Sequence, residues 1–240
     1  MSIVYNPFTD NLDYRGISSG ASFFTSVAIQ TFTSSGTYTP TTGMKYAQIE
    51  TVGGGAGGGG VDGNANYSNS SGGGGAGGYS RKIVTAATIG ASQTVTIGAG
   101  GAGGAAGYNN GVSGGDTSVG TLCIAKGGTG GGAGGGLNQN GTGGLGGVAG
   151  TGDFTCTGAP GHTQAFAVAA VGLLIFPSTA GGSSIFGGGA REIYTQGSSA
   201  GGNATNYGGG GGGAYQQAGV GTSFAGGNGT SGVVIITEYI

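Results

Sequence analysis

The residues that could act in catalysis are few, and no motif brings them together. The single histidine, His162, stands in GAPGHTQ, and no GxSxG motif surrounds any serine. Asp62, Asp116 and Asp153 each stand alone in a loop-like context, without the Asp-x-Asp-x-Asp-Gly spacing of a calcium loop. No spacing among the eight acids suggests the paired carboxylates of a glycosidase. We therefore expect His162 at a turn or on the surface, the aspartates as turn caps, and no enzymatic activity.

One glycine-rich segment imitates a nucleotide-binding motif. Residues 98–103 read GAGGAG, contain GxGxxG and follow the strand-like segment QTVTI. That fingerprint binds a dinucleotide only where a helix follows it and an acid lies about 20 residues further on. The next residues, GAAGYNNGVSGGD, contain no helix-forming run, and the chain has no GKS or GKT triplet. The sequence predicts no nucleotide site and no other cofactor.

The two cysteines predict neither a metal site nor a redox motif. Cys123 and Cys156 lack CxxC spacing and have no neighbouring ligand residues. The first residues, MSIVYNPFTDNLDYRG, show no basic segment followed by an apolar one, so no secretory signal is visible. We expect two reduced, packed thiols, with a disulfide as the alternative.

Composition excludes several classes of protein. Of 240 residues, 67 are glycine and only four are proline, and glycine clusters in runs, unlike the strict repeat of collagen. Six Lys and Arg residues spread along the chain cannot form a nucleic-acid-binding patch. The formal net charge of -2 is too small for disorder by charge repulsion. The longest apolar stretch, residues 165–176, is too short to span a membrane, and we expect a buried strand or short core helix there.

The glycine runs determine the expected fold. Glycine loses more backbone entropy on folding than any other residue, so the runs are either flexible linkers or a dense hydrogen-bonded array. Linker glycine usually alternates with serine, whereas here it alternates with Ala, Thr, Leu and Val. Gly141, Gly144, Gly147 and Gly150 recur every three residues, which is the period of an extended threefold helix. The sequence therefore predicts packed polyglycine II-like runs.

Short strand-like segments alternate with the glycine-rich runs. Residues 29–39 flank a Ser-Gly turn at Ser35-Gly36, and residues 45–52 alternate, with Ala47 and Ile49 on one face. Further strands are expected at residues 81–86, 93–97, 121–126 and 232–239. We predict a mainly β fold with very little α-helix. Residues 1–28 form an N-terminal arm for docking or assembly, and residues 29–240 form the glycine-rich domain.

Several pieces of the chain, in order, are similar to one known family. Residues 32–60, FTSSGTYTPTTGMKYAQIETVGGGAGGGG, resemble the opening of the glycine-rich domain at the ends of bacteriophage tail fibres. The same pattern continues through GGGGAGGYSRKIV (72–84), VTIGAGGAGG (95–104), AGGSSIFGGGA (180–190) and GNGTSGVVIITEY (227–239). The resemblance covers roughly residues 29–240. It implies polyglycine runs packed as threefold helices, with variable loops at one end that contact a receptor.

The resemblance implies a virion protein, a tail-fibre tip or receptor-binding adhesin, made in the host cytoplasm without a signal peptide. Its partners would be a host surface glycan or outer-membrane protein, bound without a metal, and other virion proteins that residues 1–28 contact. A homotrimer is expected, because chains with a small core are often stabilised by association. A self-assembling structural fibre or capsid-decoration protein is the alternative. A depolymerase is a third class, which the scarcity of acids disfavours.

The inserts between glycine runs supply the candidate contact residues, since glycine offers no side chain that could discriminate between ligands. Tyrosine gives a large contact area at low entropy cost, with adaptable Asn, Gln and Ser around it. The alternative is that these tyrosines cap the ends of the glycine array. The candidates are Tyr67, Tyr108, Asn109, Tyr194, Tyr207, Tyr215 and Gln216, with Asn66 and Asn206 beside them.

Overall fold

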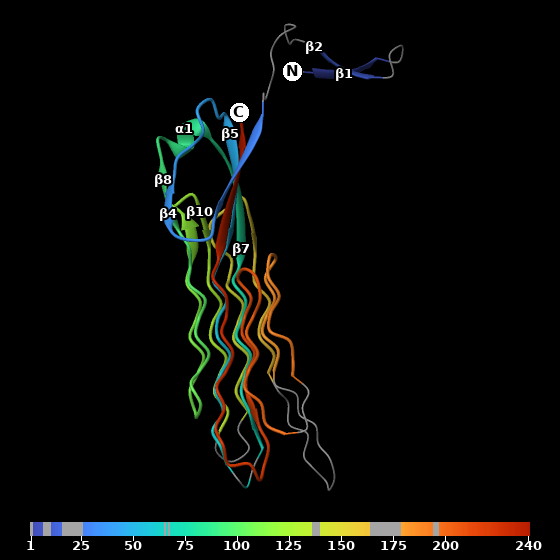
Figure 1. Cartoon of the computed structure of the whole chain (residues 1–240). Coiled ribbons are helices and arrows are strands. Elements are labelled where there is room, and N and C mark those ends of the chain that lie inside the picture. Colours follow the sequence, from blue (N-terminus) through green and yellow to red (C-terminus); the bar gives the residue numbers. More distant parts are fainter. Residues whose placement is uncertain are drawn as a thin grey trace.

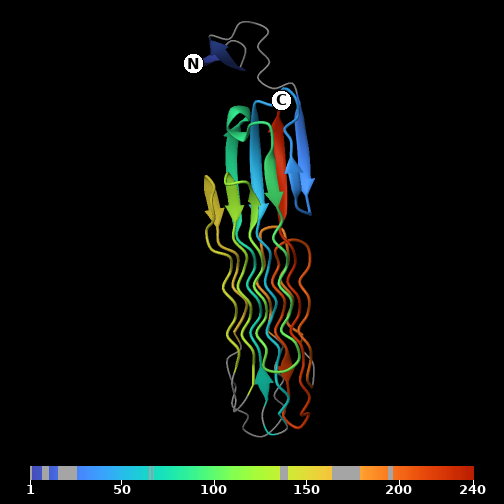
Figure 2. The same cartoon turned by 90° about the vertical axis from the view of Figure 1, so that its left-hand side faces the viewer.

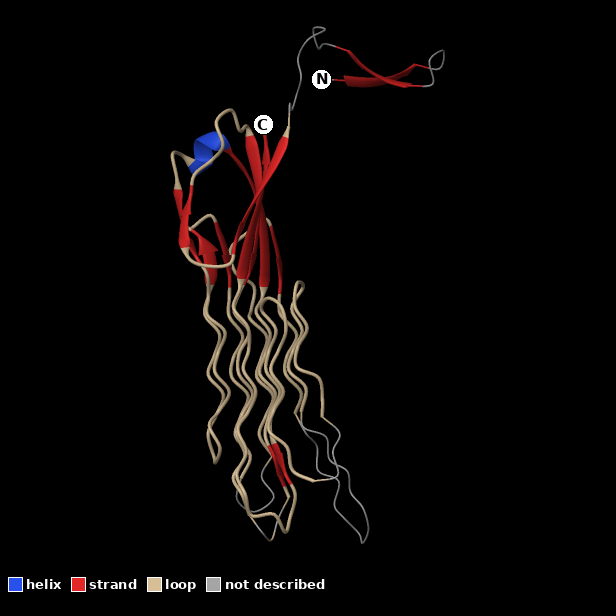
Figure 3. Cartoon of the chain, viewed as in Figure 1, coloured by secondary structure: helices blue, strands red, loops and turns tan. Residues whose placement is uncertain are grey.

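The computed structural model describes residues 2–6, 11–15, 26–64, 66, 68–135, 140–163, 179–193 and 197–240. A β-sandwich forms one end of the glycine-rich domain, and a long bundle of glycine-rich runs extends from it (Figure 1). The only helix among the described residues is α1 (Ala86–Ile89). Figure 3 shows that strand is concentrated in the sandwich, while the runs are coloured as loop and follow undulating courses alongside one another. The predicted mainly β fold with very little helix is confirmed.

Two antiparallel sheets make up the sandwich. One has five strands in the order β11-β7-β5-β13-β3, and the other has four in the order β10-β9-β8-β4. The strands of the first are β3 (Val27–Phe32), β5 (Tyr46–Val52), β7 (Tyr79–Thr85), β11 (Phe154–Cys156) and β13 (Val233–Tyr239). Those of the second are β4 (Gly36–Tyr38), β8 (Gln93–Thr96), β9 (Thr117–Val119) and β10 (Cys123–Ala125). Short two-residue strands β6 (Asn69–Ser70) and β12 (Tyr215–Gln216) pair with each other, as do β1 (Ser2–Asn6) and β2 (Asn11–Arg15).

Period-two alternation places the sandwich core between the sheets. In β5, Ala47 and Ile49 are fully buried, as the sequence predicts, and Ile236 of β13 lies opposite Ile49. Val95 and Val119 of the four-stranded sheet complete the same cluster. The apolar cluster is small, because each strand contributes at most two side chains to it.

The segment expected to turn at Ser35-Gly36 connects the two sheets. β3 and β4 flank that turn, but they belong to opposite sheets: β3 pairs with β13 and β4 pairs with β8. The turn thus crosses from one sheet to the other. Tyr38 of β4 thereby enters the core, where its ring lies 6.4 Å from that of Phe32 in an edge-to-face arrangement.

A buried carboxylate joins the two sheets. Glu238 of β13 is fully buried, and it accepts hydrogen bonds from the Tyr38 hydroxyl (2.7 Å) and the Thr41 backbone N–H (3.0 Å). The Thr41 hydroxyl and the Gln30 amide also donate to this carboxylate. Burial pushes the pKa of the Glu238 carboxyl upward, but these hydrogen bonds outweigh it and hold the pKa below its ordinary value. The ionised form is therefore the one that the fold stabilises.

The glycine runs form a lattice of backbone hydrogen bonds. Residues 53–61 donate in rotation to three neighbouring runs, changing partner at each residue and returning to the first partner at every third. This period of three is that of an extended threefold helix. Three other runs donate to residues 53–61, so the run has six neighbours. It donates to runs 70–78, 109–115 and 223–232, and it accepts from runs 98–107, 126–135 and 208–214.

Three runs, which we call the inner runs, each have six neighbours of this kind: residues 53–61, 70–78 and 208–214. They hydrogen-bond to one another, and every residue in them is buried. The outer runs surround them, side by side along the bundle (Figure 2). Within the described residues these are 98–107, 109–115, 126–135, 140–150, 157–163, 179–184, 187–192, 199–206 and 223–232. The runs thus show the predicted polyglycine II-like packing, in a bundle whose outer runs surround the three inner ones.

The period of three also separates buried from exposed positions on the outer runs. In residues 140–150, Gly141, Gly144 and Gly147 are buried and donate to the inner run 70–78, whereas Leu145 and Val148 are exposed. A Cβ built on Gly144 would overlap the carbonyl oxygen of Thr129. The corresponding Cα–H bond therefore points at that carbonyl oxygen, a weak hydrogen bond that recurs throughout the bundle. Glycine is required at these positions because neighbouring backbone occupies the place of a side chain.

We predict that Gly144→Val destabilises the protein by about 3 kcal/mol or more, because the valine side chain would force backbone runs apart. Gly202→Ala is the matched control, since its nearest neighbours to a new Cβ are 3.7 Å or more away. This control should leave stability unchanged or slightly raised. The measurement is thermal unfolding of both variants, where equal melting temperatures would show that residues 141–150 are not part of a packed array.

We also predict that Glu238→Gln lowers stability by about 3 kcal/mol at pH 7. The glutamine NH₂ group cannot accept a hydrogen bond, so at least one of the groups that donate to the Glu238 carboxylate would be left without an acceptor. The folded-state pKa of Glu238 is lowered, so its contribution is complete above the unfolded-state pKa and is lost as pH falls through the folded-state value. The difference between variant and wild type should therefore shrink below about pH 4.5. Denaturant unfolding at pH 7 and pH 3 measures it, and a difference independent of pH would contradict the assignment.

Candidate functional site

The end of the bundle farthest from the sandwich, which we call the tip, holds connections between successive runs (Figure 2). Those in the described residues are 62–64, 66 and 68, then 105–110, and 217–222. Each follows or precedes a run that is fixed by the lattice: the Asn109 carbonyl, for example, accepts from Gly60 N–H at 2.8 Å. The lattice thereby places segments that are far apart in the sequence at one end of the molecule.

Hydrogen bonds join two of these connections to each other. The Ser223 hydroxyl donates to Asp62 Oδ1 at 3.2 Å and accepts from the Gly63 N–H at 3.0 Å. The Ala218 N–H donates to the Ser68 hydroxyl at 3.1 Å. Hydrogen bonds thus connect residues 62, 63 and 68 of one segment with residues 218 and 223 of the other.

Among the described residues of the tip, Tyr108 presents a large exposed aromatic surface. Its side chain is 62% exposed, and its ring lies beside Gly135 and the Asp62 side chain, where a Cβ on Gly135 would meet it at 2.7 Å. The neighbouring Asn109 is exposed, but its amide donates to the carbonyls of Ala105 and Ala106 (both 3.3 Å), which shapes the turn. Tyr108 is therefore placed to contact a ligand, while Asn109 holds the loop that carries it.

Two predicted contact residues lie inside the protein. Tyr215 is 2% exposed and Gln216 is fully buried, and both belong to β12, whose partner is β6. Burial raises the pKa of the Tyr215 phenol. The Gln216 amide donates to the Asn64 carbonyl at 3.1 Å, so this side chain supports the 62–68 segment from below. Their burial fits the alternative that residues of the inserts cap the ends of the glycine array. We therefore leave both residues out of the contact surface proposed below.

Tyr207 lies at the opposite end of the bundle from Tyr108. It is half-buried and packs where the runs meet the sandwich, against the cluster of Val52, Tyr79 and Val233. Asn206 beside it is exposed and adopts a left-handed turn conformation with φ of 59°. Tyr67 and Tyr194 lie outside the described residues, and Asn66 is exposed at the tip. Among the predicted residues that the structure describes, Tyr108 and Tyr207 thus lie at opposite ends of the bundle and do not form one site.

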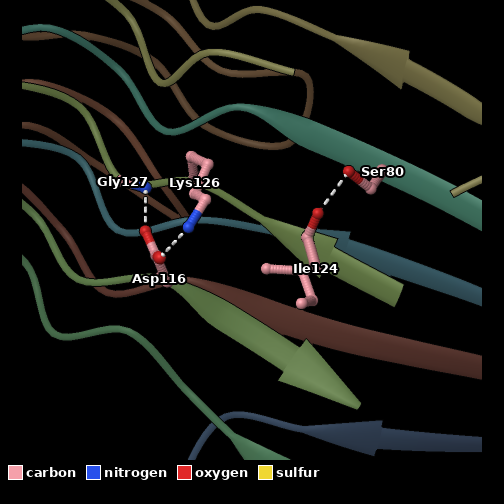
Figure 4. Close-up of polar contacts among 5 residues, drawn as sticks. All are labelled: Ser80, Asp116, Ile124, Lys126 and Gly127. Carbon is pink, nitrogen blue, oxygen red and sulfur yellow. Dashed lines mark hydrogen bonds and ion pairs between the residues drawn. The ribbon is translucent and has the colours of Figure 1, made fainter. Parts of the chain in front are cut away.

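The junction between runs and sandwich carries its own polar contacts (Figure 4). Lys126 Nζ lies 2.7 Å from Asp116 Oδ2, and the Gly127 N–H donates to Asp116 Oδ1 at 3.0 Å. Burial would raise the pKa of the Asp116 carboxyl, but the hydrogen bonds from Lys126 and Gly127 and the lysine charge lower it overall. The Ser80 hydroxyl donates to the Ile124 carbonyl at 2.6 Å. These contacts join outgoing and incoming runs where the strands end.

The remaining chemically active side chains do not assemble into a site within the described part of the chain. His162 is exposed, as expected, with Nδ1 3.2 Å from Glu192 Oε1. Cys123 is buried and Cys156 half-buried, and both are free thiols, as predicted. Across the described ranges, no three His, Cys, Asp or Glu residues are close enough to hold a metal ion, and no helix is long and apolar enough to cross a membrane. The apolar segment 165–176 lies outside the described residues.

A family model described as a glycine-rich domain matches residues 30–239, which is nearly the whole of the sandwich and the bundle. The chain belongs to this family. The match begins within β3 and ends at the last residue of β13, the two strands that pair at one edge of the five-stranded sheet. The glycine-rich domain thus combines the sandwich and the polyglycine bundle. No curated protein matches the chain.

We predict that Tyr108→Ala leaves the melting temperature unchanged, whereas Tyr215→Ala destabilises by about 3 kcal/mol or more, the usual effect of removing a buried aromatic side chain. The two variants remove the same atoms at the same end of the lattice, so each serves as the other's control. Thermal unfolding of both is the measurement. Equal effects would mean that Tyr108 packs in the protein as Tyr215 does.

Proposed function

We propose that this glycine-rich domain protein is a virion structural protein, the tip of a phage tail fibre or a receptor-binding adhesin, which recognises the host cell surface through the tip of its bundle. The observation that carries the proposal is the gathering of connections at the tip, with the exposed Tyr108 among them. A glycan or an outer-membrane protein on the host surface is the proposed ligand, bound without a metal.

The shape of the molecule supports this proposal. The lattice is rigid, because its inner runs have every neighbour hydrogen-bonded, and it holds the tip away from the sandwich (Figure 1). Glycine runs offer no side chains for discrimination, so selectivity falls to the connections between them. Tyr108, with Asp62 and Asn66 in neighbouring connections, supplies an aromatic surface and hydrogen-bonding groups of the kind that recognition surfaces use.

Assembly into the virion is part of the same proposal. The N-terminal arm, residues 1–28, is proposed to dock the protein on other tail or fibre proteins, and the functional particle is proposed to be a homotrimer. Mass photometry of the purified chain tests the oligomeric state, and a monomer at micromolar concentration would contradict the trimer without affecting the tip.

The outer surface of the lattice bears on the alternative of a self-assembling fibre. Within the described runs every exposed position carries a side chain, and the glycines are buried or half-buried. Ala99, Val112, Thr142 and Leu145 are examples. A further polyglycine run from another copy could not approach such a surface as closely as the runs approach one another. This favours a discrete particle over lateral growth, and electron micrographs of the purified chain distinguish them.

The test of recognition is binding of the fluorescently labelled chain to a panel of bacterial cells, followed by the same measurement on Tyr108→Ala. We expect the variant to lose at least tenfold in affinity for the cells that the wild type binds, because the exposed ring contributes contact area. Thr94→Ala, an exposed change on the outer face of the sandwich, should bind as wild type. Normal binding by Tyr108→Ala would remove Tyr108 from the contact surface, and binding to no cell type would contradict the adhesin.

A further inference from the structure

Three asparagines of the chain are each followed by glycine, in the sequences Asn110-Gly111, Asn140-Gly141 and Asn228-Gly229. Asparagine is chemically labile, and most so before glycine, because glycine has no side chain that hinders attack by its nitrogen. In deamidation the deprotonated backbone nitrogen of the glycine bonds to Cγ of the asparagine, and the side-chain amide leaves as ammonia. Water then opens the succinimide ring to aspartate or isoaspartate. All three sequences lie in outer runs of the lattice.

The lattice itself requires glycine after each of these asparagines. A Cβ built on Gly111 would overlap the Gly57 carbonyl oxygen, and one built on Gly229 would overlap that of Gly55. Gly141 is crowded by neighbouring backbone in the same way. A bulkier residue would slow deamidation, but these positions have no room for one. The labile sequences are thus a consequence of the packing.

The same packing engages the nitrogen that would attack. The N–H groups of the three glycines donate to carbonyl oxygens of neighbouring runs, each at 2.9 Å: Gly111 to Gly131, Gly141 to Ser70 and Gly229 to Gly101. An N–H that donates to a carbonyl oxygen keeps its proton, whereas the attacking form of the nitrogen is deprotonated. The hydrogen bond also directs the nitrogen toward the neighbouring run. Attack on Cγ therefore requires the two runs to separate.

Two of the asparagine side chains are held as well. Asn110 Oδ1 accepts from the Ala133 N–H at 2.8 Å, and Asn228 Oδ1 accepts from the Gly103 N–H at 2.8 Å. Each side chain would have to leave this hydrogen bond before its Cγ could meet the glycine nitrogen. Both asparagines are exposed to water. Their protection would therefore come from the hydrogen bonds between runs and not from burial.

We propose that the lattice protects its own Asn-Gly sequences from deamidation, so that these sites are modified only where the runs separate. The protection matters because isoaspartate adds one carbon atom to the backbone. That atom would shift the later residues of the run out of the period of three, and their N–H groups would miss their carbonyl partners. The hydrogen bonds that hold the bundle together thus also preserve the covalent chain on which they depend.

The test compares deamidation of the native chain with that of the chain unfolded in guanidinium chloride, both kept at pH 8 for the same time. Trypsin cleaves after Lys82, Lys126 and Arg191, so each Asn-Gly sequence lies in a peptide of its own, within residues 83–126, 127–191 and 192–240. Mass spectrometry measures the fraction of each asparagine that has become an acid. We expect each site to react at least about tenfold more slowly in the native chain, because strongly hydrogen-bonded segments open rarely.

Gly130→Ala tests whether contact between runs is what protects. A Cβ at position 130 would overlap the Gly111 carbonyl oxygen and push run 126–135 away from run 109–115. We expect faster deamidation at Asn110 and an unchanged rate at Asn228. Gly202→Ala is the matched control, since a Cβ there has room, and it should leave all three rates unchanged.

Equal rates in the native and unfolded chains would overturn the proposal, and this comparison does not depend on either variant. An unchanged rate at Asn110 in folded Gly130→Ala would also overturn it, because protection would then not require the contact between the two runs. Melting temperatures measured in parallel establish that each variant is folded.

Discussion

The structure depends on the hydrogen bonds that glycine backbones make when no Cβ separates them. Fixing a residue's backbone opposes folding by roughly 1–2 kcal/mol, and a hydrogen bond returns about 1 kcal/mol net. A glycine run therefore orders only where its residues use both donor and acceptor, and this is what the inner runs achieve with six neighbours each. Carbonyl oxygens that lie where side chains would be, as Thr129 does at Gly144, add weaker Cα–H contacts. The bundle is thus held together by backbone hydrogen bonds between its runs and not by a hydrophobic core.

The sandwich aligns the glycine runs at one end of the lattice. Antiparallel strands lie about 4.8 Å apart. β5 continues directly into run 53–61, and runs 70–78 and 223–232 lead directly into β7 and β13. The paired strands thus hold these three runs in alignment where the lattice begins. Contacts at the junction, such as Lys126 with Asp116, fix where the strand pattern ends and the period of three begins. The buried Glu238 ties both sheets together at the far end of the sandwich, so the alignment is not lost by sliding of one sheet on the other.

Sequence predicts the features that have a period. The spacing of Gly141, Gly144 and Gly147 predicts the threefold lattice, and the alternation of Ala47 and Ile49 predicts the buried face of β5. Features without a period are not predictable in this way. Nothing local shows that Ser35-Gly36 crosses between sheets, since the choice depends on which strand pairs with β4. Tyr207, Tyr215 and Tyr108 stand in similar polar inserts, yet one packs at the junction, one is buried and one is exposed, because the three-dimensional position of each run decides burial.

Amide hydrogen exchange of the native protein tests the lattice most directly. Residues 53–61 contain almost no side-chain core, so a linker would exchange all of these amides at the rate of an unfolded chain. The account predicts strong protection of all nine amides, and in residues 141–148 protection of Gly141, Gly144 and Gly147 above that of the exposed Val148. Uniform, rapid exchange through either segment would contradict a fold held by its glycine backbones.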